Sequence, residues 1–434
     1  MPLSAVSGTL TTLTLLFVIA SSVSSGFTQQ KSRTDTKSAN SSSIESAETL
    51  LTSGNDEAKR GNYEAAIKAF KSAHDAFKKA SEKSSKKEEP LYNMTYANER
   101  IGDVHLVAGK HEAAIAIYSA VLVERGKLAK TFPKSSLMMA GVGFAHERLG
   151  TAEFDRGNDS EALSRFNNFH DLLKALSESD SKDIRWHRGH SISHTKLGAV
   201  YRKQRINKQA IDNLKAAANI AKAVAADWPK EPGVDEDLYS ALLELGEAYR
   251  VSGEYLSAKS SYEAALPVIR RVADAAPKDA YALNSLGVVN DRLGDMMMFS
   301  GNPKAAIEFY RTAYELIQMA QGGSTKSTVI EFNSVIMLFT LALAEGLSGS
   351  DKNAEIAKLY TEFRNLLDLK TEQSAQKRSY LASELFRLVV NPVVARQRLV
   401  ESMAVYDRQD KSRKLRDDER LWYRVIDSGL RALP

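Results

Sequence analysis

The sequence predicts an all-α solenoid that is built from antiparallel helix pairs. Three observations predict it: glycine recurs every 48 residues, alanine recurs in a second fixed phase, and an aromatic residue or leucine follows each of these alanines four positions later. A recurrence at this period is typical of stacked repeats, in which each unit buries its apolar face against its neighbours.

The phased glycines lie inside helical stretches, where glycine costs roughly 1 kcal/mol relative to alanine. Their recurrence indicates that a side chain at these positions would clash with a neighbouring helix. The alanines indicate the same close approach, and the large residue that follows fills the space beside it. The structural repeat positions are Gly54, Gly102, Gly150, Gly198, Gly246 and Gly294, with Ala66, Ala114, Ala162, Ala210, Ala258 and Ala306.

The residues between these positions predict two helices in each unit. A second set of glycines ends the first helix, at Gly61, Gly109, Gly157, Gly253 and Gly301. Asn62, Asn158 and Asn302 follow as expected N-caps of the second helix. Phased prolines, such as Pro133 and Pro277, end the second helix.

The stretch from Leu245 to Pro277 carries the pattern in full, with Leu-Gly-x-x-Tyr at its start, then Gly253, then Ala258-x-x-x-Tyr262. It resembles the tetratricopeptide repeat (TPR), whose usual unit has 34 residues. The unit here is longer by 14 residues, about two turns in each helix, so the buried face keeps its phase. The runs HERLG and NDRLGD resemble long-helix bacterial TPR arrays. The resemblance implies a right-handed superhelical solenoid.

Residues 1–25 are predicted to be a signal peptide or an N-terminal anchor. Leu10–Ala20 is an apolar core that small residues follow, although no basic residue precedes Lys31. A cleaved export signal is favoured, and an uncleaved membrane anchor is the alternative. Residues 26–43, rich in Ser, Thr and Lys, are expected to be a disordered linker. Six TPR-like repeats then occupy residues 44–321.

A degenerate seventh repeat is predicted for residues 322–370, where Leu341, Gly349 and Ala354 keep the phase. Its run Val335–Ala344 has a glutamate close to each end and is too short for a membrane span, so a buried core helix is expected. Residues 371–434 lose the phase but keep helical periodicity. They are predicted to form a helical C-terminal cap with a polar outer face.

Composition excludes several functional classes. The net charge of +5 is small for a chain with 26% charged residues of both signs, and a nucleic-acid surface would need a basic stripe with interleaved aromatic residues. The absence of cysteine excludes disulfides, thiol nucleophiles and cysteine metal sites. No phosphate-binding loop, nucleophile elbow or zincin motif occurs. We therefore predict no catalytic residue and no cofactor, leaving an unrecognised site in the C-terminal region as the enzyme alternative.

A histidine run needs two interpretations. His187, His190 and His194 are spaced to share one helix face, which is one way to build a three-nitrogen metal site. Basic residues flank the run, however, and asparagine takes the place of His194 in other units, as at Asn98. We favour polar packing between first helices and predict no metal ligands.

The resemblance implies that the first helices line a concave groove that binds a peptide or helix of another protein. The positions expected to face this groove are Glu99, Asp103, Glu147, Arg202, Glu247, Arg250, Asp291 and Asp295. The Lys/Asn pattern with which chaperone-binding TPR proteins capture a C-terminal carboxylate is absent from them. A basic residue recurs two positions before the glycine and is interpreted as an inter-repeat ion-pair ladder, at Arg100, Arg148, Lys196 and Arg292.

These features together predict an exported, periplasmic or secreted, non-enzymatic scaffold for protein–protein interaction. The partner is expected to be another protein and not nucleic acid, and membrane contact is expected only if residues 1–25 are retained. A membrane-tethered subunit of an envelope assembly complex is the alternative. The sequence indicates neither the partner nor the pathway nor the oligomeric state.

Overall fold

The computed structural model describes residues 39–322, apart from residue 86, and isolated residues between 330 and 345. Within this part of the chain there are twelve α-helices and no strand. The helices are α3 (Ala39–Lys59), α4 (Tyr63–Lys83), α5 (Glu88–Val107), α6 (His111–Thr131), α7 (Ser136–Arg156), α8 (Asp159–Ser179), α9 (Ile184–Lys203), α10 (Asn207–Asp227), α11 (Val234–Val251), α12 (Tyr255–Ala275), α13 (Ala280–Phe299) and α14 (Pro303–Gln321).

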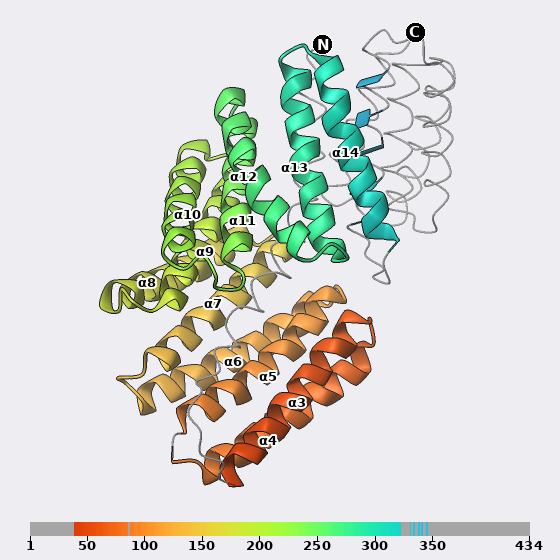
Figure 1. The fold of residues 1–434 in the computed structure, drawn as a ribbon. Coiled ribbons are helices and arrows are strands. Elements are labelled where there is room, and N and C mark those ends of the chain that lie inside the picture. The colour runs from red at the N-terminus through yellow and green to blue at the C-terminus, as the bar shows by residue number, and fades with distance from the viewer. Residues whose placement is uncertain are drawn as a thin grey trace, which may run out of the picture. The chain divides into compact units, whose positions relative to one another are not determined.

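Consecutive helices pack side by side as pairs, α3 with α4, α5 with α6, α7 with α8, α9 with α10 and α13 with α14, and each pair is one repeat (Figure 1). The contact of Gly246 with Tyr262 joins α11 to α12 in the same way. The predicted all-α solenoid of helix pairs is confirmed. The chain divides inside α12 into two compact units, each described by itself. The first compact unit ends at Val268, and the second begins at Ile269. The predicted C-terminal cap and the segment 1–25 lie outside the described residues. Helix α3 begins at Ala39, before the expected start of the repeats at Ile44.

The phased glycines lie where two helices of a pair touch. At Gly102 a Cβ atom would lie 2.4 Å from Cε1 of Tyr118, a ring that is 0% exposed. The same relation joins each phased glycine to the large residue of its second helix, in the pairs Gly54–Phe70, Gly150–Phe166, Gly198–Leu214, Gly246–Tyr262 and Gly294–Tyr310. The six phased alanines are all buried. Small residues therefore allow the close approach of the two helices, and the rings fill the space between them.

The turn between the helices of a pair requires a left-handed residue. Gly157 follows α7 with φ of 89°, and its N–H donates to carbonyls of the last turn of α7. Arg205 occupies the same place after α9 and adopts φ of 60°, a conformation that costs a residue with a Cβ about 1–2 kcal/mol. The repeat thus keeps its turn geometry even where the glycine is missing.

Two of the three asparagines predicted as side-chain caps behave differently. Asn302 Oδ1 does accept from the backbone N–H of Ala305, 3.1 Å away. Asn62 and Asn158 stand at the N-cap positions of α4 and α8, but their side chains make no capping bond. Instead, the Asn158 amide nitrogen donates to Glu153 at the end of α7, 3.0 Å away, and its oxygen accepts from the Ser160 hydroxyl at 3.3 Å.

None of the described helices is both long enough and apolar enough to cross a membrane. Half of the run Val335–Ala344 lies outside the described residues. Of its described members, Met337, Leu338, Leu341 and Ala344 are buried and Thr340 is half-buried.

Candidate functional site

The acidic residues predicted for the groove on α5 and α7 take part in ion pairs within the chain. Glu99 lies 2.6 Å from Arg125 Nη1 and 3.2 Å from Arg148 Nε, and Glu147 lies 2.7 Å from Lys196 Nζ. Both carboxylates are buried, at 2% and 1% exposed. Each acid is thus bound by the basic residue of the next repeat, and two of the four predicted ladder residues, Arg148 and Lys196, form one network with these predicted groove acids. The other two, Arg100 and Arg292, pair with acids of their own helices, Asp103 and Asp291.

The ladder reverses its polarity at the next step. Thr195 of α9 stands where Glu99 and Glu147 stand in their repeats, so α9 offers no acid there. On α11 the ladder position carries Glu244 instead of a base, and Arg202 of α9 binds it at 3.0 Å. The positive charge has moved to the earlier repeat and the negative charge to the later one, so the ion pair between repeats is retained.

The residue after the phased glycine is acidic in the repeats whose large packed residue is tyrosine, and it is not acidic where that residue is phenylalanine or leucine. Asp103 accepts from the Tyr118 hydroxyl at 2.6 Å, and Glu247 accepts from the Tyr262 hydroxyl at 2.8 Å. In the second compact unit, Asp295 accepts from the hydroxyl of Tyr310 at 2.8 Å. Where this position is not acidic, the large residue has no hydroxyl, as at Phe70, Phe166 and Leu214. At this phased position of the six described repeats, a tyrosine hydroxyl thus occurs only beside an acidic acceptor.

The remaining groove candidates are also bound within the chain. Arg250 lies 2.7 Å from Glu247 on α11. In the second unit, Asp291 lies 2.6 Å from Arg292 and accepts from Thr340 at 2.9 Å. Six of the eight candidates are buried, and Asp103 and Asp295 are half-buried. Their contact with a partner stays a prediction, while the structure gives each of them a bond within the chain, which for Arg250 is to Glu247 on the same helix.

Glu147 and Arg148 stay ionised within this network, whereas burial raises the pKa of Glu244 despite Arg202 beside it. Burial alone would raise the pKa of Glu147, but Lys196 and Arg148 outweigh it and hold that pKa at about 2. Burial would lower the pKa of Arg148, and the neighbouring carboxylates, Asp103 first, raise it well above its usual value. Removing one partner of such a buried pair commonly costs 3–5 kcal/mol, because the other charge is left uncompensated.

The network leaves some buried polar atoms without a hydrogen-bond partner among the described residues. They are Arg125 Nη2, Arg202 Nε, Glu244 Oε1 and Glu147 Oε2, of which Glu147 Oε2 has an ion pair with Arg148 Nη1 at 3.5 Å but no hydrogen bond. All four belong to the unit Gly8–Val268, and three of them come from the successive first helices α7, α9 and α11. A buried polar atom without a partner costs about 1–3 kcal/mol, so these atoms mark places where a polar ligand or water would be bound favourably.

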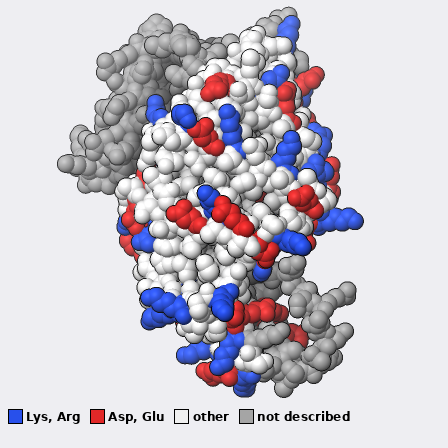
Figure 2. Space-filling model, turned by 90° about the vertical axis from the view of Figure 1, so that its left-hand side faces the viewer, with Lys and Arg blue, Asp and Glu red and all other residues white. Residues whose placement is uncertain are grey.

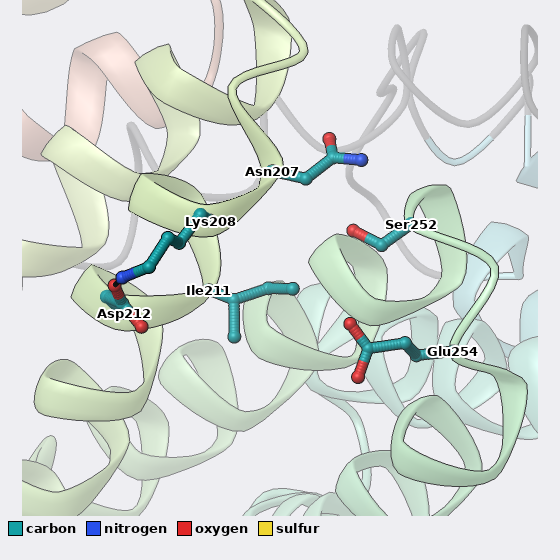
Figure 3. A pocket seen from close by; sticks show the side chains of 6 residues that line it. All are labelled: Asn207, Lys208, Ile211, Asp212, Ser252 and Glu254. Carbon is teal, nitrogen blue, oxygen red and sulfur yellow. Dashed lines mark hydrogen bonds and ion pairs between the residues drawn. The ribbon is translucent and has the colours of Figure 1, made fainter.

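A surface hollow of about 400 Å³ lies between the start of α10 and the turn after α11 (Figure 3). It is lined by Asn207, Lys208, Ile211, Asp212, Ser252 and Glu254. Lys208 and Asp212 pair at 2.7 Å, and the lysine side chain is 86% exposed, so this pair is screened by solvent. On the face that Figure 2 shows, basic and acidic side chains are interspersed, with neither sign forming a continuous patch.

The histidines of α9 separate into two environments. His187 stacks on Trp228, with ring centroids 6.1 Å apart, and its Nε2 lies 3.1 Å from the Ser181 carbonyl. His190 and His194 instead meet His170 of α8, with centroids 5.2 and 4.5 Å from its ring. The spacing along one helix predicted His187 as the third member, whereas the third ring is that of His170, which comes from another helix.

The tetratricopeptide repeat family model matches residues 51–129 and 252–320. No curated protein matches the chain. Among solved structures, the apo form of RapI is similar with a TM-score of 0.52 and 12% identity, over 91% of this chain and 98% of that one. The apo form of the quorum sensor NprR from B. thuringiensis has a TM-score of 0.49 and 12% identity, over 89% and 99%. The likeness to RapI, at this identity, is one of fold. The predicted repeat type is therefore confirmed, and the chain carries tetratricopeptide repeats within an α-helical solenoid.

Proposed function

We propose that this chain is a non-enzymatic scaffold that binds an extended segment of another protein along the first helices α7, α9 and α11. The observation that carries the proposal is a set of buried atoms on these helices that make no hydrogen bond among the described residues: Glu147 Oε2, which has only the 3.5 Å ion pair with Arg148, Glu244 Oε1 and the donor Arg202 Nε. An extended peptide presents both N–H and C=O groups along its length, and it can satisfy these acceptors and this donor once their side chains turn toward it.

The repeat spacing fits such a ligand. Packed helices lie about 8–10 Å apart, and an extended chain advances about 3.3 Å per residue. About three peptide residues would therefore span the step from one first helix to the next. The ion pairs between repeats, such as Lys196 with Glu147 and Arg202 with Glu244, fix the helices before the partner arrives. A preorganised surface loses less entropy on binding.

A pair of Arg→Lys variants tests this function. Arg202→Lys keeps a positive charge for Glu244 but removes the Nε donor, whereas Arg165→Lys makes the same change in the more exposed pair with Glu161 on α8. A hydrogen bond that involves a charged group contributes about 1.5–3 kcal/mol, so we expect Arg202→Lys to weaken partner binding roughly 10- to 100-fold. Arg165→Lys should bind as the unaltered chain does.

The measurement is recovery of partner from the exported fraction by each immobilised variant, followed by titration with the identified partner. Thermal unfolding of both variants controls for loss of fold. Equal affinity of Arg202→Lys and the unaltered chain, at equal stability, would reject binding along these helices.

We further propose that residues 1–25 direct export and are removed, with retention as a membrane anchor as the alternative. The apolar core Leu10–Ala20 followed by small residues supports this proposal. Mass spectrometry of the mature protein decides between the two. A chain that starts near Gly26 supports cleavage, and a chain that retains Leu10–Ala20 contradicts it.

A further inference from the structure

Three histidines from two helices converge on the surface of the first compact unit. His170 lies on α8, and His190 and His194 lie on α9, with the three ring centroids between 4.5 and 5.2 Å apart. One nitrogen of each ring lies within 4.8 Å of the others. All three side chains are half-buried, so the three rings lie at the surface of the unit rather than in its core. We call these three residues the histidine cluster.

The hydrogen bond of His194 fixes its tautomer. Its Nδ1 lies 2.9 Å from Oδ1 of Asn213 on α10. The amide nitrogen of Asn213 donates to the Gln209 carbonyl at 2.9 Å, which leaves the amide oxygen facing the ring. An amide oxygen can only accept, so Nδ1 of His194 carries the hydrogen and Nε2 carries the lone pair.

Two serines fix the other rings in the same way. His170 Nδ1 lies 3.1 Å from Ser193 Oγ, whose own hydrogen is donated to the His190 carbonyl at 2.7 Å. His190 Nδ1 lies 3.4 Å from Ser177 Oγ, whose hydrogen is donated to the Lys174 carbonyl at 2.8 Å. Both hydroxyl oxygens are therefore left as acceptors, and Nδ1 of each ring is the donor. The Nε2 atom of His190 is buried and has no hydrogen-bond partner among the described residues.

We propose that the histidine cluster binds one divalent transition metal ion of the zinc class through the Nε2 atoms of His170, His190 and His194. Metal-binding histidines ordinarily donate their second nitrogen to an outer acceptor, which orients the ring, and here Asn213, Ser193 and Ser177 accept from it. An all-imidazole set suits zinc, copper or nickel and not magnesium or calcium. The fourth position is left for water or for a ligand from a partner.

The ring nitrogens must move only a short distance to bind one zinc ion. Zinc–nitrogen bonds of about 2.0–2.1 Å in a tetrahedral site place the nitrogens about 3.3 Å apart. One nitrogen of each ring already lies within 4.8 Å of the others, so an approach of at most about 1.5 Å is needed for nitrogens at that distance. Rotation of half-buried side chains can supply this movement, because both helices can stay in place.

The surrounding charges partly favour and partly oppose an ion. Burial lowers the pKa of all three histidines, and for His190, with the two neighbouring rings adding to burial, to about 4, so the rings are neutral at pH 7. Asp171 on α8 favours a cation, and Lys174 on the same helix opposes one. His187 is the further titratable group on α9, and α10 contributes the uncharged Asn213. Removal of Lys174 should therefore strengthen metal binding.

Isothermal titration of the metal-stripped full chain, made without a polyhistidine tag, with zinc chloride at pH 7.5 tests the site. We expect one ion per chain with a micromolar or lower Kd. A triple variant, His170→Ala with His190→Ala and His194→Ala, should lose at least 100-fold in affinity. His187→Ala is the matched control on the same helix and should bind as the unaltered chain does.

Two further variants keep all three ligands and test the arrangement itself. Asn213→Ala removes the outer acceptor of His194 and should weaken zinc binding on the order of 10-fold. Lys174→Gln should strengthen it, and the visible absorption bands of bound Co²⁺ should persist in both variants. Zinc affinity that is unchanged in the triple variant, or that is lost equally in His187→Ala, would overturn the site. Unchanged affinity in Asn213→Ala would overturn the assigned tautomers.

Discussion

The contact between glycine and ring in each repeat can be tested at Gly102. A Cβ added there would lie 2.4 Å from Cε1 and 2.8 Å from Cδ1 of Tyr118. The ring is 0% exposed, and its hydroxyl is held by Asp103 at 2.6 Å, so it cannot turn aside. Overpacking of this kind costs about 1–3 kcal/mol, and a contact this short belongs at the upper end. Alanine returns about 1 kcal/mol of helix propensity. We expect Gly102→Ala to lower the free energy of unfolding by about 2 kcal/mol.

Gly126 in α6 provides the matched control within the same repeat. No atom would lie within 4 Å of a Cβ there, and its backbone is not left-handed. Gly126→Ala should therefore raise the free energy of unfolding by about 0.5–1 kcal/mol. The assay is urea unfolding followed by circular dichroism, with the transition midpoints compared at equal slope. A Gly102→Ala chain as stable as Gly126→Ala would refute the argument that side-chain volume places the phased glycines.

Other contacts give further expected outcomes. Tyr118→Phe removes the hydroxyl that donates a hydrogen bond to Asp103. It should lower the free energy of unfolding by about 1.5 kcal/mol, measured by urea unfolding. Arg205→Gly removes the strain of a left-handed backbone at an exposed position. It should raise the free energy of unfolding by about 1 kcal/mol in the same assay. The pKa of His190 falls from 6.5 to about 4 on folding, first because of burial, so the unfolded chain takes up the proton first as pH falls. Stability should decline between pH 6.5 and pH 4, and His190→Gln should reduce that decline.

Each of these outcomes has a contrary result. A neutral Tyr118→Phe change would mean that Arg100, which also pairs with Asp103, satisfies the carboxylate alone. A destabilising Arg205→Gly change would show that the arginine makes a compensating contact. An unaltered acid decline in the His190→Gln chain would assign the titration to other groups.

Much of the fold could be predicted because small and large side chains recur at a fixed period in the sequence. Gly102 and Tyr118 stand at fixed positions of a unit that recurs, so their contact is repeated and its phase is visible without coordinates. The turn after α9 was invisible for the opposite reason, because Arg205 breaks the residue pattern while keeping the backbone conformation.

The candidate site was less predictable because charge pairing depends on contacts between repeats. Glu99 and Arg148 were recognised separately, one as a groove residue and the other as part of a ladder. Their separation of about one unit was the signal that they could meet. The histidine cluster could not be predicted from spacing within one helix, since His170 comes from a second helix and only tertiary packing brings it to His190.

The reversal of the ladder has a consequence for the order of the repeats. The apolar contacts of successive units are nearly alike, so apolar packing alone discriminates weakly between neighbours. The charges do discriminate, because α11 presents Glu244 and requires the Arg202 that α9 supplies. If α11 were packed against α7 in place of α9, Glu244 would approach Glu147, and two buried like charges repel. Lys196 likewise requires the acid that α7 supplies. The buried ion pairs therefore specify which unit stacks on which, a role in which charge serves specificity rather than net stability.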